Sequence, residues 1–230
     1  MNLFIDRISV MGRFIECCCT SVYEVSEAVA GGASRIELCE NLEIGGTTPS
    51  PGLTEQVLDI CPIPVNVLIR PRGGDFVFSE EEGERMREDI LDCKRLGVNG
   101  VVIGALHPDG SIDTGMMHRL IQAARPLSVT FHRAFDCCSD PFRALEDIIS
   151  LGCDRLLTSG LSASAYEGRE LLRELVSAAG DRIIIMPGAG VKPSNIAELE
   201  AVTRAREFHG SAHSGSGTTD RRVVSQLAGQ

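Results

Sequence analysis

The chain has 230 residues, of which 43% are hydrophobic and 23% are charged, and its formal net charge is −10. These values are typical of a folded globular protein and exclude a disordered or fibrous chain. The negative charge and the lack of Lys/Arg-rich runs argue against nucleic acid or a membrane surface as the main partner. We therefore expect a soluble protein whose partner is a small ligand or another protein.

The nine cysteines are expected to be thiols, because Cys17, Cys18 and Cys19 are adjacent and the odd total fits no regular disulfide framework. The first residues contain no apolar stretch long enough for a signal peptide or a membrane span. Together these features predict a cytoplasmic protein. We expect residues 1–12 to form an N-terminal extension, residues 13–213 one domain, and residues 214–230 a C-terminal tail that docks as a last segment or stays loose.

Apolar, β-branched runs alternate with helical patterns along the chain. In chain order, strands are expected at Phe14–Cys18, Arg35–Cys39, Val65–Arg70, Gly100–Gly104, Ser128–His132, Arg155–Thr158, Arg182–Met186 and Glu207–His209. Strands that alternate with helices are typical of repeated βαβ units. Eight such units predict an α/β fold, a single-domain TIM (β/α)8-type barrel. An open, doubly wound sheet is less favoured, because it normally needs a topological switch point.

The predicted helices have recognisable start signals. Ser21 with Glu24, and Ser79 with Glu82, have the spacing of a capping box, in which each side chain accepts a hydrogen bond from the other residue's backbone N–H. The longest helix is expected at Glu80–Leu96.

Strand parity predicts which side chains point into the barrel, because successive side chains alternate between the helix-covered face and the interior. The outward set is apolar and contains Ile15, Cys17, Ile36, Leu38, Val65, Val67, Ile69, Val129 and Phe131. The inward set is polar and contains Glu16, Cys18, Arg35, Glu37, Cys39, Asn66, Arg70, Thr130 and His132, to which the shorter late strands add Thr158 and His209. Several of these groups lie near the C-terminal ends of their strands, where barrel enzymes place their sites.

The inward carboxylates and histidine suggest acid–base chemistry. Glu16 and Glu37 on neighbouring strands would lie about 5 Å apart, and such a separation raises the pKa of one carboxyl group. The alternative is a structural ion network that Arg70 neutralises. His132 suits a general acid–base or a metal ligand, or else it is a core histidine oriented by Asp136.

Cys18 and Cys39 are soft donors on neighbouring strands, and two thiolates in this position suit Cu(I). The alternative is that both are small buried hydrophobic side chains, as free cysteines usually are. Cys137 and Cys138 are additional thiols after the fifth strand.

Glycine-rich turns follow the seventh and eighth predicted strands, and in many barrels such turns present backbone N–H groups to a phosphate. Glycine also closes tight turns without any ligand. The candidate anion-binding residues are Arg70, Thr158, Gly188, Gly190, His209 and Ser211.

Several stretches resemble one known family. They are Glu16-x-Cys18, RIELCENLEIGGTTPSPG from Arg35, IRPRGGDF from Ile69, TFHRAFD from Thr130, LTSG from Leu157 and EFHGSA from Glu207. From about Phe14 to Ser214 the chain resembles the CutC copper homeostasis family. The resemblance implies a cytoplasmic TIM-type barrel that forms a homodimer or homotetramer and is linked to copper, with Cu(I) held by cysteines that correspond in position to Cys18 and Cys39.

Two functions remain open at this stage. The leading hypothesis is a cytosolic copper homeostasis protein that binds Cu(I) through Cys18 and Cys39 at the C-terminal mouth of the barrel. The alternative is a barrel enzyme of the lyase, isomerase or hydrolase type that acts on a small anionic or phosphorylated substrate. Its acid–base residues would be Glu16, Glu37 and His132.

Overall fold

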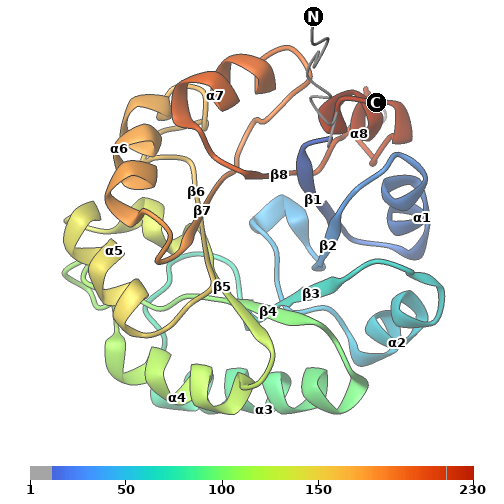
Figure 1. Cartoon of the computed structure of the whole chain (residues 1–230). Coiled ribbons are helices and arrows are strands. Elements are labelled where there is room, and N and C mark those ends of the chain that lie inside the picture. The colour runs from blue at the N-terminus through green and yellow to red at the C-terminus, as the bar shows by residue number, and fades with distance from the viewer. Residues whose placement is uncertain (1–11, 216) are drawn as a thin grey trace, which may run out of the picture.

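Eight parallel strands and eight helices form a nearly closed barrel in the computed structural model, which describes residues 12–215 and 217–230 (Figure 1). Strands β1 to β8 are Phe14–Cys19, Arg35–Leu38, Val65–Leu68, Gly100–Ile103, Ser128–Phe131, Arg155–Thr158, Ile184–Pro187 and Glu207–Gly210. Helices α1 to α8 are Val22–Ala30, Pro51–Ile60, Glu80–Leu96, Thr114–Ala124, Pro141–Ser150, Arg169–Ala179, Ile196–Thr203 and Arg221–Ala228. The predicted TIM-type barrel is confirmed.

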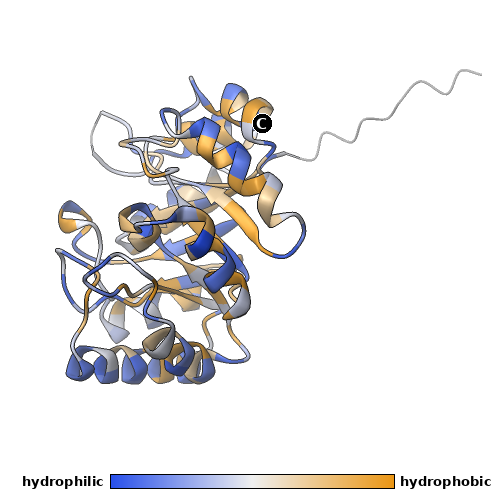
Figure 2. Ribbon diagram, turned by 90° about the vertical axis from the view of Figure 1, so that its left-hand side faces the viewer, coloured by the Kyte–Doolittle hydropathy of each residue, from blue (hydrophilic) through white to orange (hydrophobic). Residues whose placement is uncertain are grey.

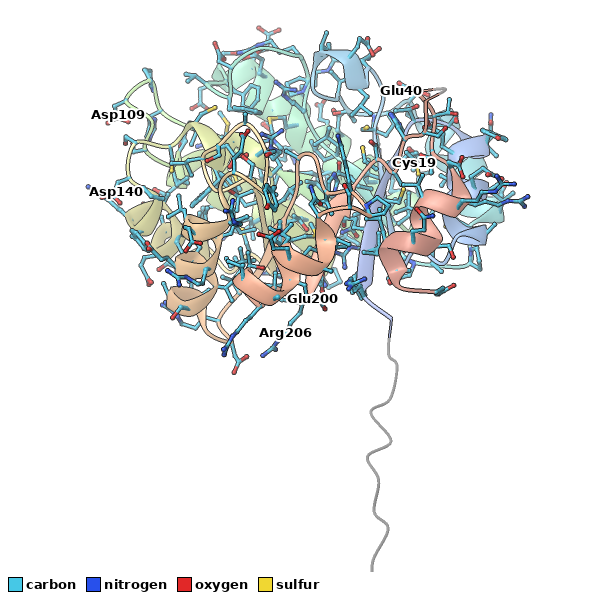
Figure 3. The ribbon with its side chains drawn as sticks, turned by 90° about the horizontal axis from the view of Figure 1, so that it is seen from above. Cys19, Glu40, Asp109, Asp140, Glu200 and Arg206 are labelled. Atoms are coloured by element: carbon cyan, nitrogen blue, oxygen red, sulfur yellow. The ribbon has the colours of Figure 1, made fainter. Side chains whose placement is uncertain are left out.

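The strands follow one another around the barrel in chain order, and β1 pairs in parallel with both β2 and β8. β7 packs beside β8 and brings the barrel close to full closure. The helices form a ring outside the strands (Figure 1). Figure 3 shows the two ends of the barrel: Glu40 and Asp109, which follow β2 and β4, lie toward the upper edge, whereas Arg206, which precedes β8, lies at the lower edge.

Local capping explains where two of the helices begin. At α3 the predicted capping box is complete, since the Glu82 N–H donates to Ser79 Oγ and the Ser79 N–H donates to Glu82 Oε2. At α1 only half of the box forms. Ser21 Oγ accepts from the Glu24 N–H, but the Glu24 carboxylate accepts from the N–H of Thr20 instead. Among the described residues, no helix is both long and apolar enough to span a membrane.

The core is divided into an outer and an inner part, as strand parity predicts. Every residue of the predicted outward set belongs to one large hydrophobic cluster between the strands and the helices. A second, small cluster lies inside the barrel and contains Cys18, Cys39, Leu68 and Val102. Figure 2 shows hydrophobic colour along the interior strands and mixed colour on the surrounding helices. The polar interior groups therefore lie in a compartment separate from the main hydrophobic core.

The expected C-terminal tail, residues 214–230, contains α8, which packs against α1 and β1. The Arg13 N–H donates to the Ala228 carbonyl at 3.1 Å. The last helix of the barrel therefore lies in this segment and docks, which is the first of the two alternatives expected for residues 214–230. Residues 1–11 of the expected N-terminal extension lie outside the described residues.

Candidate functional site

A cavity of about 700 Å³, which we call the main cavity, opens at the ends of several strands. Its lining comes from residues near the ends of β1, β2, β3, β6 and β8, from the loops that follow β2, β3, β5, β7 and β8, and from Val223 of α8. The polar part of this lining includes Cys18, Glu37, Arg70, His132, His209 and Ser211. The main cavity thus lies at the C-terminal end of the barrel strands, where TIM-barrel enzymes carry their active sites.

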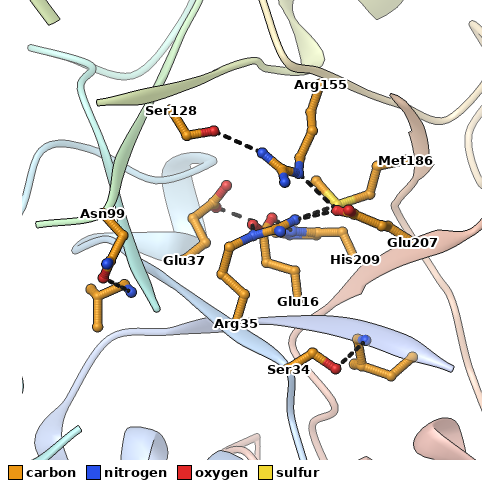
Figure 4. A network of polar contacts seen from close by, with 12 residues as sticks. Glu16, Ser34, Arg35, Glu37, Asn99, Ser128, Arg155, Met186, Glu207 and His209 are labelled. Atoms are coloured by element: carbon orange, nitrogen blue, oxygen red, sulfur yellow. Dashed lines mark hydrogen bonds and ion pairs between the residues drawn. The ribbon is translucent and has the colours of Figure 1, made fainter. Parts of the chain in front are cut away.

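An ion network fills the barrel interior next to the main cavity (Figure 4). The Arg35 guanidinium donates to Glu16 Oε2 at 2.5 Å and to Glu207 Oε2 at 2.6 Å. Arg155 donates to the same Glu207 oxygen at 2.8 Å, and His209 Nδ1 lies 2.9 Å from Glu16 Oε1. Because Glu16 is fully buried, its charge depends on these partners.

His209 lies between two carboxylates, and this arrangement sets three pKa values. Burial opposes its charge, but Glu37 and Glu16 together raise the pKa of His209 to about 9. Burial alone would raise the pKa of Glu16, but the hydrogen bond with His209 and the charge of Arg35 outweigh burial and lower this pKa to about 2. Burial dominates at Glu37 and raises its pKa to about 7. The two glutamates therefore have opposite shifts, and only Glu37 lines the main cavity.

Two thiols meet beside Glu37. Cys18 Sγ lies 3.4 Å from Cys39 Sγ, and both residues are buried. Cys18, Glu37 and His209 each offer one ligand atom, and these atoms lie within 4.8 Å of one another. The contact with Cys39, burial and the Glu37 charge raise the pKa of Cys18 well above its usual value. The two thiols suit a soft metal ion, whereas the Glu37 carboxylate is a donor that harder cations prefer.

His132 is held as a neutral imidazole. Its Nδ1 accepts the N–H of Ala134 at 3.2 Å, so the proton of the neutral ring lies on Nε2. Burial and the nearby Arg70 charge lower the pKa of His132 to about 3. The ring packs on Phe76 with 5.0 Å between centroids. Among the described residues, Nε2 has no hydrogen-bond partner.

Arg70 is a buried cation held by carbonyl groups. Its guanidinium donates to the carbonyls of Ile44, Gly46 and Gly74, which belong to the loops after β2 and β3. It also lies 4.7 Å from the centre of the Phe76 ring. In the described part of the chain, Nε has no hydrogen-bond partner and no carboxylate forms an ion pair with Arg70. The carbonyls orient the guanidinium but do not neutralise it.

Comparison with known proteins identifies the family. The model of the CutC family matches residues 13–214. The chain belongs to the CutC family. A CutC family protein of Parabacteroides distasonis is 55% identical over 205 residues, which cover 89% of this chain and 84% of that protein. A CutC family protein of Xylella fastidiosa is 55% identical over 200 residues, covering 87% and 75%.

Solved structures agree with this assignment. The candidate copper homeostasis protein CutC of Streptococcus agalactiae superposes on the CutC chain with a TM-score of 0.82 at 35% identity, covering 86% of this chain and 98% of that one. Phosphoribosylanthranilate isomerase of Thermotoga maritima superposes with a TM-score of 0.61 at 14% identity, covering 94% and 96%. At that identity the likeness concerns the fold alone.

Most of the site residues predicted for this CutC family member lie together. Those that line the main cavity are Cys18, Glu37, Arg70, His132, Gly190, His209 and Ser211. Glu16 and Cys39 lie next to the cavity, in contact with His209 and Cys18. Thr158, Gly188 and Asp136 are absent from its lining.

Asp136 and Thr158 have a role different from the predicted one. Asp136 does not orient His132. Its carboxylate accepts hydrogen bonds from Thr158 Oγ1 at 2.5 Å and from Arg133 Nε at 2.7 Å. The predicted inward parity of Thr158 is wrong, since Leu157 lines the cavity instead. Two successive leucines in β6 gave no polar alternation from which the parity could be read.

The raised pKa expected for one of the two glutamates is found at Glu37, where the Glu16 charge adds to burial, but their neutralising partner was predicted wrongly. The β1–β2 ladder places Glu16 opposite Arg35, and Glu37 opposite Cys18. Arg35, rather than Arg70, therefore neutralises Glu16. No role was predicted from the sequence for Glu207 or Arg155. Both residues begin strands and point inward by parity, and a charged side chain inside the barrel needs a partner of opposite charge.

Proposed function

We propose that this CutC family member takes part in copper homeostasis by binding Cu(I) through Cys18 and Cys39. The observation that carries the proposal is the 3.4 Å separation of the two sulfur atoms in a buried position. Thiolates are the ligands that Cu(I) prefers. The apolar side chains of Leu68 and Val102 pack around the pair and limit access of water.

The spacing of the thiols suits a single ion. The two sulfur atoms lie 3.4 Å apart, so one ion placed beside them can contact both. Glu37 and His209 offer further donor atoms beside Cys18. Because the pKa of Cys18 is raised, Cu(I) must displace a proton, and its affinity should increase with pH.

A chelator competition tests this proposal. Reduced protein is titrated anaerobically with Cu(I) against a competing chelator, as wild type and as the Cys18→Ser/Cys39→Ser variant. We expect one tightly held ion per chain in the wild type and its loss in the double variant. Cys137→Ser is the matched control, because Cys137 is an exposed thiol away from the pair. Tight binding that survives in the double variant would contradict the proposal.

A second candidate function is an enzyme that acts on a small anionic or phosphorylated substrate. The observation that favours it is the buried Arg70 cation, which lines the main cavity without a carboxylate partner. In this reading Arg70, Gly190 and Ser211 hold the anion and Glu37, whose pKa is raised to about 7, serves as the acid–base group, whereas His132 stays neutral and donates from Nε2. Arg70→Gln should then abolish anion binding and leave Cu(I) binding intact, which separates the two functions by calorimetry.

The cytoplasmic location and the homo-oligomeric assembly implied by the family resemblance stay predictions. Light scattering of the purified protein measures the second directly.

A further inference from the structure

Four buried polar atoms of the cavity lining have no hydrogen-bond partner among the described residues. One of them, His213 Nε2, lies 3.6 Å from the Glu24 carboxylate, and three remain. They are Arg70 Nε, His132 Nε2 and Glu37 Oε2. The residues that carry them all line the main cavity, and each is at most 5% exposed. Buried polar atoms are nearly always hydrogen-bonded, so three such atoms at one cavity need an explanation. A ligand with complementary atoms would satisfy them.

The hydrogen-bond character of these atoms defines what the ligand must offer. Arg70 Nε is a donor in every state, and His132 Nε2 is a donor because Nδ1 already accepts the Ala134 N–H. Glu37 Oε2 is a carboxylate oxygen and pairs best with a donor. The ligand must therefore combine an acceptor group for Arg70 and His132 with a donor group for Glu37.

Charge balance indicates that the acceptor group carries one negative charge. The interior network pairs three basic side chains with three carboxylates, namely Arg35, Arg155 and His209 with Glu16, Glu37 and Glu207. Arg70 lies outside these pairs and contributes one buried cation. An unpaired buried cation is costly. A single carboxylate balances Arg70, whereas the second charge of a phosphate dianion would lie close to Glu37 unless it paired with Lys192, a solvent-exposed residue of the same lining.

The walls of the cavity suit a small organic molecule. Leu42, Leu68, Phe76 and Leu157 supply apolar surface, and the volume of about 700 Å³ is in the usual range for ligand sites. Ala189 and Ala212 also line the cavity and have φ values of 73° and 50°. This left-handed backbone conformation is energetically unfavourable for residues other than glycine, and such strain concentrates at binding sites.

We propose that the main cavity binds a small carboxylate that also carries hydroxyl groups, of which a sugar acid is the simplest type. The carboxylate accepts hydrogen bonds from Arg70 Nε and His132 Nε2, and a hydroxyl group donates to Glu37 Oε2. This inference rests on the second candidate function, because it identifies the anion as a hydroxy acid. Its carboxylate contacts, Arg70 and His132, are separate from Cys18 and Cys39, whereas Glu37 also belongs to the donor atoms beside Cys18.

Four probes separate the parts of this proposal. Gluconate carries both groups, hexanoate only the carboxylate, glucitol only the hydroxyls, and inorganic phosphate a different anion. Binding to the reduced full-length protein is measured by calorimetry with a metal chelator present. We expect gluconate to bind at least about tenfold more tightly than hexanoate, since a hydrogen bond to a charged group is lost in hexanoate. Glucitol and phosphate should bind more weakly than gluconate.

Variants then assign the contacts. Arg70→Gln should abolish the binding of both carboxylates. Glu37→Gln, which keeps the shape of the side chain, should weaken gluconate about tenfold and leave hexanoate unchanged, because a neutral acceptor replaces a charged one. Arg133→Gln is the matched control, since Arg133 also lines the cavity but already pairs with Asp136. It should bind both probes like the wild type.

Because Arg70 also ties two loops together, Arg70→Lys is a second variant that retains the charge. It should keep part of the gluconate affinity, and circular dichroism verifies the fold of each variant. Equal binding of gluconate and hexanoate, or of gluconate to wild type and Glu37→Gln, overturns the hydroxy-acid assignment. Phosphate bound through Arg70 without gluconate overturns it too but leaves the anion site standing. Failure of all the anions to bind overturns both.

Discussion

Removal of the Arg35 guanidinium should destabilise the barrel strongly. Arg35 is 4% exposed and makes ion pairs of 2.5 Å with Glu16 and 2.6 Å with Glu207. Breaking a buried ion pair by removing one partner costs about 3–5 kcal/mol. Glu16 keeps His209 and Glu207 keeps Arg155 as a second partner. We therefore expect Arg35→Gln to lower the free energy of unfolding by an amount at the lower end of this range, about 3 kcal/mol.

The assay is urea unfolding followed by circular dichroism, with the slope against denaturant compared between variants. Arg206→Gln is the control, because Arg206 pairs with Asp181 at 3.3 Å on the surface, with side chains 81% and 89% exposed. An exposed pair of this kind contributes less than about 1 kcal/mol. If Arg35→Gln costs no more than Arg206→Gln, the interior network does not stabilise the fold as argued here.

Two further predictions concern the pH dependence and a helix cap. The pKa of His209 is raised from 6.5 to about 9 in the folded protein, so its contribution to stability is complete below pH 6.5 and is lost as the pH rises toward 9. Urea unfolding between pH 6 and pH 9 should show this loss in the wild type, and an equal loss in His209→Gln would contradict the assignment. Ser79→Ala removes the cap of α3 and should cost about 1 kcal/mol. A thermal melt measures it, and an unchanged melting temperature would show that the cap is dispensable.

The sequence predicts the barrel and most of the cavity residues because both depend on short-range patterns. Alternation along β1 and β2 placed Cys18 and Cys39 on the inner face, and strand adjacency then brought them together. Which charged side chains form ion pairs depends instead on how far neighbouring strands are shifted along one another, and no local sequence pattern encodes that shift. Parity placed both Arg35 and Arg70 inside the barrel, and the ion network was assigned to Arg70, but of the two only Arg35 pairs with carboxylates in the folded barrel.

The loop residues were hardest to predict. Asp136 lies four residues after His132 along the chain, but the 3₁₀ helix between them turns its carboxylate toward Thr158 on the next strand. The tautomer of His132 likewise follows from a backbone N–H in that helix. Side-chain directions in such short segments are fixed by packing rather than by periodicity.

The interior ion network has a consequence for the order in which the chain folds. Glu16 finds His209 across 193 positions of sequence, and Arg35 finds Glu207 across 172. In a nascent chain whose last strand has not yet been synthesised, Arg155 has no carboxylate partner and Arg35 has only one. A partial barrel lacks these ion pairs and is less stable than the complete barrel. The early strands therefore gain their full stability only when synthesis is nearly complete, because their ion pairs need residues of the last strand.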